Sequence, residues 1–497
     1  MSTQSAGAPS GPRWTLDAKT GFIVACSVLL AVTVVVGRGV APVAAMLILL
    51  SALLAWHRSI LAWPVVICLF ASSVLFVPVA RYSLTIHLPL GLDFWQLAVI
   101  LVVLVWVAAL LVDPAVRLRR TPLDGPIALI VAASLGSVVV NYGRVAPLAS
   151  PVLKALITFV SFIALYYFIT SVVTTAARLY LISQFIVSGV AVVAFFAIVE
   201  QRAGFNVFDH VGSILPVLQI DGGGGLIYRN GLIRATGSAD HPIALGVLFA
   251  MVFPLGLAFA KSRSPVWWVP TSLILIGVLA STSRTAFLAL ATVGVALLWL
   301  RPGDIRPLLP LAIPMLIVIK IAAPGSIATL KDSFLPSSGQ EGLIASQRQL
   351  AADPTLISGR ANFRPRLVEG LHRPLLGQGL GTRQTGADNP LRNSPILDNQ
   401  WLGTFLDIGL IGIAGWLWLI VRIDRRLGRI ARTRGSPDGL LAAGFVASIT
   451  GFAVAMLTYD SLAFIQEAVI LWVVLALAAA LVAVHPTTED ALTEPAA

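Results

Sequence analysis

Long apolar runs separated by short polar turns fill most of this chain. A helix needs about 20 apolar residues to cross the ~30 Å hydrocarbon core of a bilayer. Three of the runs, 40–55, 126–141 and 307–322, are short for this task, so we expect 12–14 membrane-spanning helices. The predicted spans are 21–37, 40–55, 60–77, 94–112, 126–141, 153–175, 179–199, 241–260, 267–281, 285–300, 307–322, 401–421, 439–458 and 465–484.

The composition excludes a soluble protein, because 57% of the residues are hydrophobic, only 11% are charged and the mean hydropathy is +0.90. The short alternating strands of a membrane barrel are not seen. We therefore predict an all-α polytopic membrane protein with about 14 transmembrane helices. Run 21–37 is too long for the apolar part of a signal peptide and is followed at once by further spans, which favours a retained first helix.

The distribution of Lys and Arg predicts the orientation, because short cytoplasmic loops are enriched in both residues. With the N-terminus inside, the short internal loops are rich in arginine, and the last of them reads RIDRRLGRIARTR. The short external loops hold only Arg38, Arg81 and Arg144. We expect a bacterial cytoplasmic membrane protein with both termini in the cytoplasm and its active site on the external face.

These features divide the chain into seven segments. We expect a disordered cytoplasmic N-terminus (1–20), N-terminal transmembrane helices (21–199), an external loop (200–240), central transmembrane helices (241–322), a large, partly helical external catalytic loop (323–400), C-terminal transmembrane helices (401–484) and a disordered cytoplasmic tail (485–497). Pro310 and Pro314 predict a kink or a broken helix in the span 307–322.

The second half of the large loop is rich in arginine. From Ser358 to Asn393 it carries six arginines against two acids, Glu369 and Asp388. Arginine recognises phosphate through a planar fork of donors, so this loop predicts an anionic ligand. The candidates for binding it are Arg360, Arg364 and Arg366.

A second candidate anion site lies in the run RATGSADHP before the span 241–260. It places Arg234 near Asp240 and His241, and Pro242 starts a helix whose N-terminus favours an anion. The alternative reading of Arg234 is an interfacial arginine that contacts lipid head groups.

Two further polar turns lie between predicted spans. Arg284, in STSRTAF, is held near the membrane surface by a four-residue turn, and its alternative role is to cap the preceding helix. Asp398 and Asn399 open the span 401–421, where they serve either as a carboxylate that deprotonates a hydroxyl or as helix N-caps.

Weaker candidates for the proton acceptor are Glu369 and His372. Asp407 and Glu467 lie within spans, where a carboxylate is costly, so we expect them to pair with an arginine above.

No sequence motif indicates a metal or a cofactor. HExxH, GxSxG and P-loop patterns are absent, the six histidines are scattered, and Cys26 and Cys68 lie inside apolar runs. Asn399 adds an amide beside Asp398 but no metal-ligand pattern. We expect a metal-independent site without a cofactor.

The order of these motifs resembles the bacterial O-antigen ligase and O-antigen polymerase family. The resemblance rests on RATG before one span, STSRTA between two spans, SGR followed by PLLGQG in a large external loop, and DNQWLG at the start of the next span. It covers roughly residues 230–415. It implies a fold similar to GT-C-type glycosyltransferases and transfer of a glycan from a polyprenyl diphosphate donor to an acceptor hydroxyl, generally without metal.

The resemblance also implies roles for individual residues. Arg234 and Arg360 would hold the donor's diphosphate, and Arg284 would be a structural or secondary contact. Ligases of the family have His before Asn where this chain has Asp398, which occurs in polymerase-like relatives and favours polymerisation. Pro365 departs from a continuous helix and predicts a helix start at 365–372.

The leading hypothesis is therefore a metal-independent, inverting membrane glycosyltransferase that polymerises surface polysaccharide repeat units. Its expected partners are the lipid-linked donor, a glycan or lipid-glycan acceptor, membrane lipids and chain-length or assembly proteins, with no nucleic acid. The alternatives are ligase-type transfer to a lipid or cell-wall acceptor, a flippase for lipid-linked oligosaccharide, and a scaffold for polysaccharide assembly. A flippase would carry its arginines within spans, which here are nearly free of them.

Overall fold

The computed structural model describes residues 62–311, 367–383 and 397–485, with Pro314 and Ile317, apart from short gaps at 80, 86–92, 114, 216, 222–224, 230–231, 369 and 434. The chain divides into two compact units, Met1–Val66 and Ile67–Ala497. The elements that carry the candidate site belong to the second unit. The predicted spans 21–37 and 40–55 and both predicted disordered termini lie outside the described residues, except for His485.

The described chain is almost entirely helical. Its longer helices, in chain order, are α3 (Trp63–Phe76), α4 (Phe94–Val112), α5 (Asp124–Val140), α7 (Ala149–Val172), α8 (Ala176–Ala203), α10 (Pro242–Ser262), α11 (Trp268–Ala280), α12 (Arg284–Leu300), α18 (Gln400–Ala431), α19 (Pro437–Ala455) and α20 (Ile465–Val484). Short helices are α6 (Tyr142–Val145), α9 (Val211–Ile214) and α13 (Pro302–Ile305). Each long helix coincides with a predicted span to within a few residues at its start.

Seven described helices are long and apolar enough to cross a membrane, and an eighth is added if α12 and the bent segment Pro302–Pro310 count as one span. The bend between these two is 116°. Three further apolar helices are shorter: Trp63–Phe76, Asp124–Val140 and Pro265–Ala280. The protein is thus a multi-pass, all-α membrane protein with seven or eight candidate spans in the described part. The predicted count of about 14 spans stays a prediction. Of the predicted span 307–322, the described start is a 3₁₀ turn, Arg306–Leu311.

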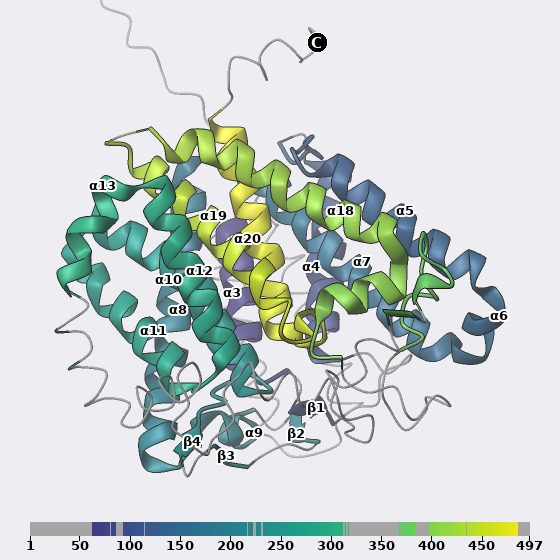
Figure 1. Ribbon diagram of the computed structural model, residues 1–497, viewed down its shortest axis with the longest axis horizontal. Helices are drawn as coiled ribbons and strands as arrows, with labels where there is room; N and C mark the ends of the chain where they lie inside the picture. Colours follow the sequence, from purple (N-terminus) through teal and green to yellow (C-terminus); the bar gives the residue numbers. More distant parts are fainter. Residues whose placement is uncertain are drawn as a thin grey trace, which may run out of the picture. The chain divides into compact units, whose positions relative to one another are not determined.

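Helices α10 and α20 form the centre of the bundle, since nearly all of their residues are buried. A helix that is apolar all round is stable only when protein or lipid covers every side. Helices α8, α11, α12 and α19 cover α10, and α7, α18 and α19 pack against α20 (Figure 1). Small residues allow this close approach: a Cβ on Gly277 would lie 2.8 Å from the ring of Phe249.

Helix α18 differs from the predicted span 401–421 in two ways. It continues to Ala431, through most of the arginine-rich segment that was predicted as a cytoplasmic loop. It is also interrupted at Gly409, whose φ of 69° and ψ of −167° are not helical. The first part, Gln400–Ile408, is called the half-helix below.

The segment 370–383, called the inserted segment, fills this interruption. The N–H groups of Leu410 and Ile411 donate to the carbonyls of Pro374 and Leu375 at 2.8 and 3.2 Å. A broken helix in a membrane is stable only when other groups take up its freed backbone donors and acceptors. The PLLGQG motif therefore supplies backbone hydrogen-bond partners to the interrupted helix.

The freed carbonyls of the half-helix also find donors. Leu406 O accepts the N–H of Gln378 at 2.7 Å, and Asp407 O accepts the hydroxyl of Ser137 at 2.5 Å. Ser137 belongs to α5, which packs along α18. The interruption is therefore fixed from two sides.

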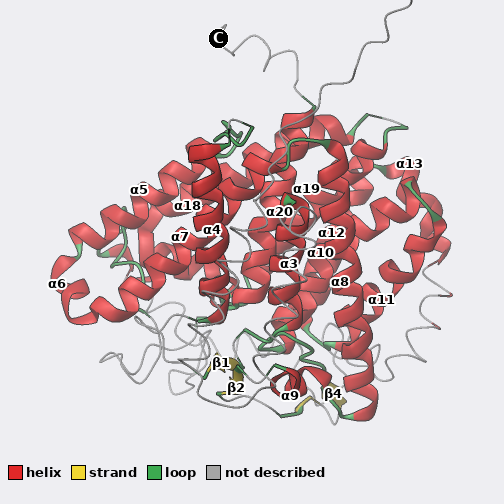
Figure 2. Cartoon of the chain, turned by 180° about the vertical axis from the view of Figure 1, so that it is seen from behind, coloured by secondary structure: helices red, strands yellow, loops and turns green. Residues whose placement is uncertain are grey.

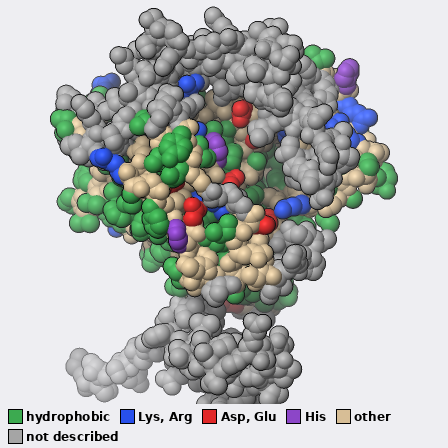
Figure 3. All heavy atoms as spheres, turned by 90° about the horizontal axis from the view of Figure 1, so that it is seen from below, with side chains coloured by type: hydrophobic (Ala, Val, Ile, Leu, Met, Phe, Trp, Pro, Cys, Tyr) green, Lys and Arg blue, Asp and Glu red, His purple; other side chains and the backbone are tan. Residues whose placement is uncertain are grey.

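The helices alternate in direction, so the polar segments gather at two ends of the bundle. Two small antiparallel sheets lie at one end, β1 (Tyr82–Leu84) with β2 (Leu218–Ile220) and β3 (Ile227–Arg229) with β4 (Leu232–Arg234) (Figure 2). Figure 3 views this end, where basic and acidic side chains lie among apolar ones. We call it the loop end; it comprises β1 and the described residues of 141–148, 203–241, 281–283, 377–383, 397–399 and 456–464.

Candidate active site

Asp398 lies at the loop end, directly before α18, and its backbone is held by a second aspartate. Asp460 Oδ2 accepts the N–H groups of Leu397 and Asp398 at 3.0 and 3.2 Å. Asp398 has a φ of 48°, in the left-handed region that non-glycine residues seldom adopt. Burial raises the pKa of Asp460, although Arg383 and the backbone N–H groups act in the opposite direction. The carboxylate of Asp460 thus fixes the backbone conformation of Asp398.

The start of α18 is tied to the loop 456–464 between α19 and α20. The N–H of Gln400 donates to the carbonyls of Met456 and Tyr459 at 2.8 and 3.0 Å. Its Oε1 accepts the N–H of Leu462 at 3.0 Å. The half-helix therefore begins at a fixed position relative to this loop.

Of the two predicted cap residues, Asn399 is the N-cap of α18. Its Oδ1 accepts the N–H of Leu402 at 3.0 Å. The side chain of Asp398 is half-buried and is not the helix cap. The N-cap role therefore belongs to Asn399 and not to Asp398.

Arg234, at the end of β4, is buried against the turn between α11 and α12. Its Nε donates to Ser281 O at 3.4 Å, and the N–H of Ala235 donates to Ala280 O at 3.3 Å. Arg284 is the first residue of α12, two residues beyond Thr282, which has a φ of 45°. The structure thus brings the segments of Arg234 and Arg284 together.

A buried carboxylate holds the loop that follows Arg234. Glu200, near the end of α8, accepts the N–H and hydroxyl of Thr236 with Oε1 at 3.1 and 3.0 Å. Its Oε2 accepts the N–H of Gly237 at 2.7 Å. Gly237 has a φ of 53°, a turn conformation that suits glycine.

Arg81 holds the same loop from its other side. It forms an ion pair with Asp209 at 2.5 Å and donates to the carbonyls of Gly237 and Ala239. Arg81 is therefore a structural arginine. Together with Glu200 it fixes the loop 236–239 that follows Arg234.

Asp240 and His241 differ in exposure and role. Asp240 is exposed, whereas Nδ1 of His241 accepts the N–H of Ile243 at 3.2 Å and caps α10. Helix α10 begins at Pro242, so the predicted helix start is confirmed.

The loop 456–464 connects the segment of Arg234 with that of Asp398. Gln466, just beyond it, donates to the hydroxyl of Ser238 at 2.9 Å. Thr458 donates to the hydroxyl of Thr285 at 2.9 Å. Since the same loop binds the backbone of Asp398, these segments form one contiguous region of the loop end.

The two intramembrane carboxylates behave differently. Asp407 forms a two-fold hydrogen-bonded ion pair with Arg383 of the inserted segment, with both contacts at 2.7 Å, which confirms the expected partner. Gly403 makes room for it, because a Cβ there would lie 2.8 Å from Arg383. Glu467 is buried beside Tyr459, and among the described residues no arginine pairs with it.

The remaining predicted site residues are only partly described. Arg360, Arg364, Arg366 and Glu369 lie outside the described residues. His372 is exposed, at the end of a helical stretch. No group of three or more metal-ligating side chains is found in the described part of the chain.

Residues 269–417 match the family model described as O-antigen ligase. They form an O-antigen ligase domain. In the described chain this domain contains most of α11, all of α12, the inserted segment and the start of α18, including the half-helix. No curated protein matches the sequence. The family indicates an enzyme of the O-antigen ligase and polymerase type, which transfers glycans at a membrane and uses lipid-linked glycan substrates.

The sequence reasoning missed Asp460 and Glu200, which support the two candidate segments. Asp460 lies in the polar run TYDS between two apolar spans, and that run is the signal that could have identified it. Glu200 directly follows the predicted span 179–199, and nothing in the sequence around it indicates that it is buried. Both residues lie outside the matched O-antigen ligase domain.

Proposed function

We propose that this protein polymerises surface polysaccharide, transferring a glycan from a polyprenyl diphosphate donor to a hydroxyl of a lipid-linked glycan acceptor. The observation that carries this proposal is the fixed position of Asp398. Its backbone is held by Asp460 at the start of an O-antigen ligase half-helix, and Gln466, just beyond loop 456–464, contacts the segment that follows Arg234. A carboxylate and an arginine at one end of a membrane bundle suit a reaction in which a hydroxyl loses a proton and a diphosphate departs.

In this mechanism Asp398 accepts the proton of the acceptor hydroxyl while the oxygen attacks the anomeric carbon. The bond between that carbon and the diphosphate oxygen breaks, and the configuration inverts. Arg234 and Arg360, with Arg364 or Arg366, bind the departing diphosphate. Preorganised charge at the developing anion is commonly the largest catalytic contribution.

Guanidinium groups replace a divalent cation in this proposal. A diphosphate that leaves carries a negative charge that must be neutralised, and arginine does so through paired hydrogen bonds. We therefore expect EDTA to leave activity unchanged. Arg284 lies beside the segment of Arg234, and we assign it a secondary contact with the diphosphate.

Transfer to a different acceptor, as in a ligase, is the second candidate, because the matching family is described as O-antigen ligase. The two reactions share the donor and differ in the acceptor. The aspartate at position 398 favours polymerisation, since the resemblance associates histidine at this point with ligases.

We also propose that the loop end faces outward. Among the described residues, the opposite end carries the densest group of basic side chains: Arg117, Arg119, Arg120, Arg178, Lys261, Arg263, Arg301, Arg306, Arg422, Arg425, Arg426, Arg429 and Arg432. The positive-inside rule assigns such an end to the cytoplasm.

The test uses the purified full-length protein in liposomes with a lipid-linked repeat unit as both donor and acceptor. Chain growth is followed on gels, and release of polyprenyl diphosphate is measured in parallel. Arg234→Ala, Arg360→Ala and Asp398→Asn are expected to abolish growth, whereas Arg202→Ala, a substitution at an exposed arginine of the same end, keeps it.

Normal polymer from the Arg234, Arg360 or Asp398 variant would contradict the residue assignment. Translocation of the lipid-linked unit without covalent growth would instead indicate a flippase. Transfer only when a different lipid acceptor is supplied would assign a ligase.

A further inference from the structure

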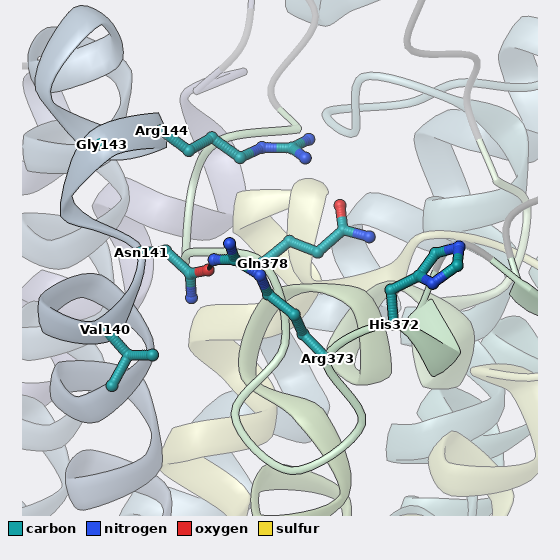
Figure 4. A pocket seen from close by; sticks show the side chains of 7 residues that line it. All are labelled: Val140, Asn141, Gly143, Arg144, His372, Arg373 and Gln378. Atoms are coloured by element: carbon teal, nitrogen blue, oxygen red, sulfur yellow. Dashed lines mark hydrogen bonds between the residues drawn. The ribbon is translucent and has the colours of Figure 1, made fainter.

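A cavity of about 410 Å³ lies between the end of α5, α6 and the inserted segment. It is lined by Val140, Asn141, Gly143, Arg144, His372, Arg373 and Gln378. The side chains of Arg144, Gln378 and His372 extend into the same open space (Figure 4). Cavities of this size hold small ligands or head groups.

The floor of the cavity is fixed by buried amides. Asn141 and Gln378 are 2% and 6% exposed. Asn141 Nδ2 donates to the carbonyls of Ser137 and Gly377 at 2.7 and 3.0 Å, and its Oδ1 accepts from Arg373. Gly377, with a φ of 67°, allows the turn that brings Gln378 here. The cavity is therefore a built feature of the fold.

The charge of the lining is positive. Arg144 and Arg373 supply two guanidinium groups, His372 adds an imidazole, and no carboxylate lines the cavity among the described residues. The bond of Arg373 to Asn141 is to a neutral amide, which leaves the charge of the guanidinium in place. Guanidinium groups beside amide donors are suited to a phosphate.

The cavity lies at the depth of lipid head groups. Helix α7 has 24 residues, so it is about 36 Å long at 1.5 Å per residue and spans the ~30 Å hydrocarbon core without α6. Tyr142, on α6, is 71% exposed, and exposed aromatic rings favour the membrane interface. Below the cavity, Leu135 and Val139 of α5 are 52% and 72% exposed, which provides an apolar surface for acyl chains.

We propose that this cavity binds the phosphate of an anionic membrane lipid, whose acyl chains lie along the exposed face of α5. The cavity is separated from Asp398 by the length of the half-helix. Asp398 precedes the half-helix, whereas Gln378 bonds to Leu406 near its other end. Nine residues of helix correspond to about 13 Å.

The site also stabilises the half-helix. The inserted segment supplies both the cavity wall and the donors that complete the interrupted α18. A lipid bound to Arg373 therefore holds the inserted segment against α5. Binding of an anionic lipid is expected to raise the thermal stability of the protein.

Native mass spectrometry of the delipidated full-length protein tests the proposal with dioctanoyl phosphatidylglycerol as the probe. Dioctanoyl phosphatidylcholine and inorganic phosphate are the comparison ligands. Arg144→Gln and Arg373→Gln are each expected to weaken phosphatidylglycerol binding by roughly tenfold, since each removes a charge-assisted contact. Arg425→Gln, at the opposite end of the bundle, is the matched control and should bind as the wild type does.

Equal phosphatidylglycerol affinity of the wild type and both cavity variants would overturn the proposal. Displacement of the lipid by millimolar inorganic phosphate, or by an acidic oligosaccharide, would show that the cavity selects a soluble anion. Arg373→Lys keeps the charge and should retain most of the binding; if it loses as much as Arg373→Gln while the melting temperature falls, the role of Arg373 is structural and the proposal fails.

Discussion

Replacement of Asp460 by alanine is expected to slow glycan transfer without removing the proposed base. Asp460 accepts the N–H groups of Leu397 and Asp398, and these two bonds hold the backbone of Asp398 in its left-handed conformation. In the alanine variant the backbone can relax toward extended conformations. The carboxylate of Asp398 then occupies its catalytic position for a smaller fraction of the time.

The size of this effect follows from the two hydrogen bonds. Each bond to a charged acceptor stabilises by about 1.5–3 kcal/mol, and water replaces part of that in the variant. The left-handed conformation of Asp398 costs about 1 kcal/mol or more once it is no longer held. A net change of about 2 kcal/mol corresponds to a roughly 30-fold loss in kcat, with little change in KM for the donor.

The assay measures release of polyprenyl diphosphate in liposomes for Asp460→Ala, Asp398→Asn and the double variant. Removal of a general base costs about 10²–10⁴-fold. If Asp460 acts through Asp398, the double variant is no slower than Asp398→Asn alone. Full kcat in a folded Asp460→Ala protein, or additive losses in the double variant, would refute the reasoning.

The pH profile supplies an independent check on the same residue. Because burial raises the pKa of Asp460, it gains its proton at a higher pH than an exposed aspartate does. The neutral carboxyl group binds the two N–H groups less strongly, so kcat should fall as the pH is lowered through this raised pKa. Asp460→Asn lacks the titration and is expected to lose this acid step while retaining a lower, flatter rate.

Two further predictions concern the inserted segment. Gly409→Ala places a Cβ 2.2 Å from a backbone carbonyl oxygen at a φ of 69°. It is expected to destabilise the protein by more than about 2 kcal/mol, measured as a lower melting temperature in detergent. The control is Gly428→Ala, in the regular part of α18 with no neighbour within 4 Å, which should be neutral or stabilising. Replacing either partner of the Arg383–Asp407 pair with alanine should cost about 2 kcal/mol, because the pair is mostly buried. The double variant should cost less than the sum of the two, and strictly additive losses would show that the pair is not coupled.

The sequence predicted the helices well where apolar runs end at charged residues. The predicted span 94–112 coincides with α4, which lies between Asp93 and Asp113. The predicted end of α18, at residue 421, was wrong, because hydropathy indicates where the membrane ends and not where the helix ends. Arginine favours helices, so α18 continues to Ala431.

The interruption at Gly409 could not be predicted for a different reason. The run GLIG reads as ordinary apolar helix, and a break within it is stable only because distant residues complete its hydrogen bonds. The same limit applies to the site. Arg234 and Asp398 were identified from local motifs. Asp460, which holds the backbone of Asp398, and Glu200, which holds the loop that follows Arg234, are separated from them along the chain and carry no motif.

The half-helix joins the proposed base to the inserted segment. Its first turn is bonded to loop 456–464, and its last residues are bonded to the inserted segment and α5. A continuous α18 would extend the bilayer-crossing helix to Asp398, whereas the break at Gly409 allows nine residues to take their position from loop contacts instead. The O-antigen ligase domain thus uses an interrupted membrane helix to place a carboxylate beside loops that carry arginine. A substitution that restores regular helix at Gly409 should therefore reduce activity through the position of Asp398, even where the protein still folds.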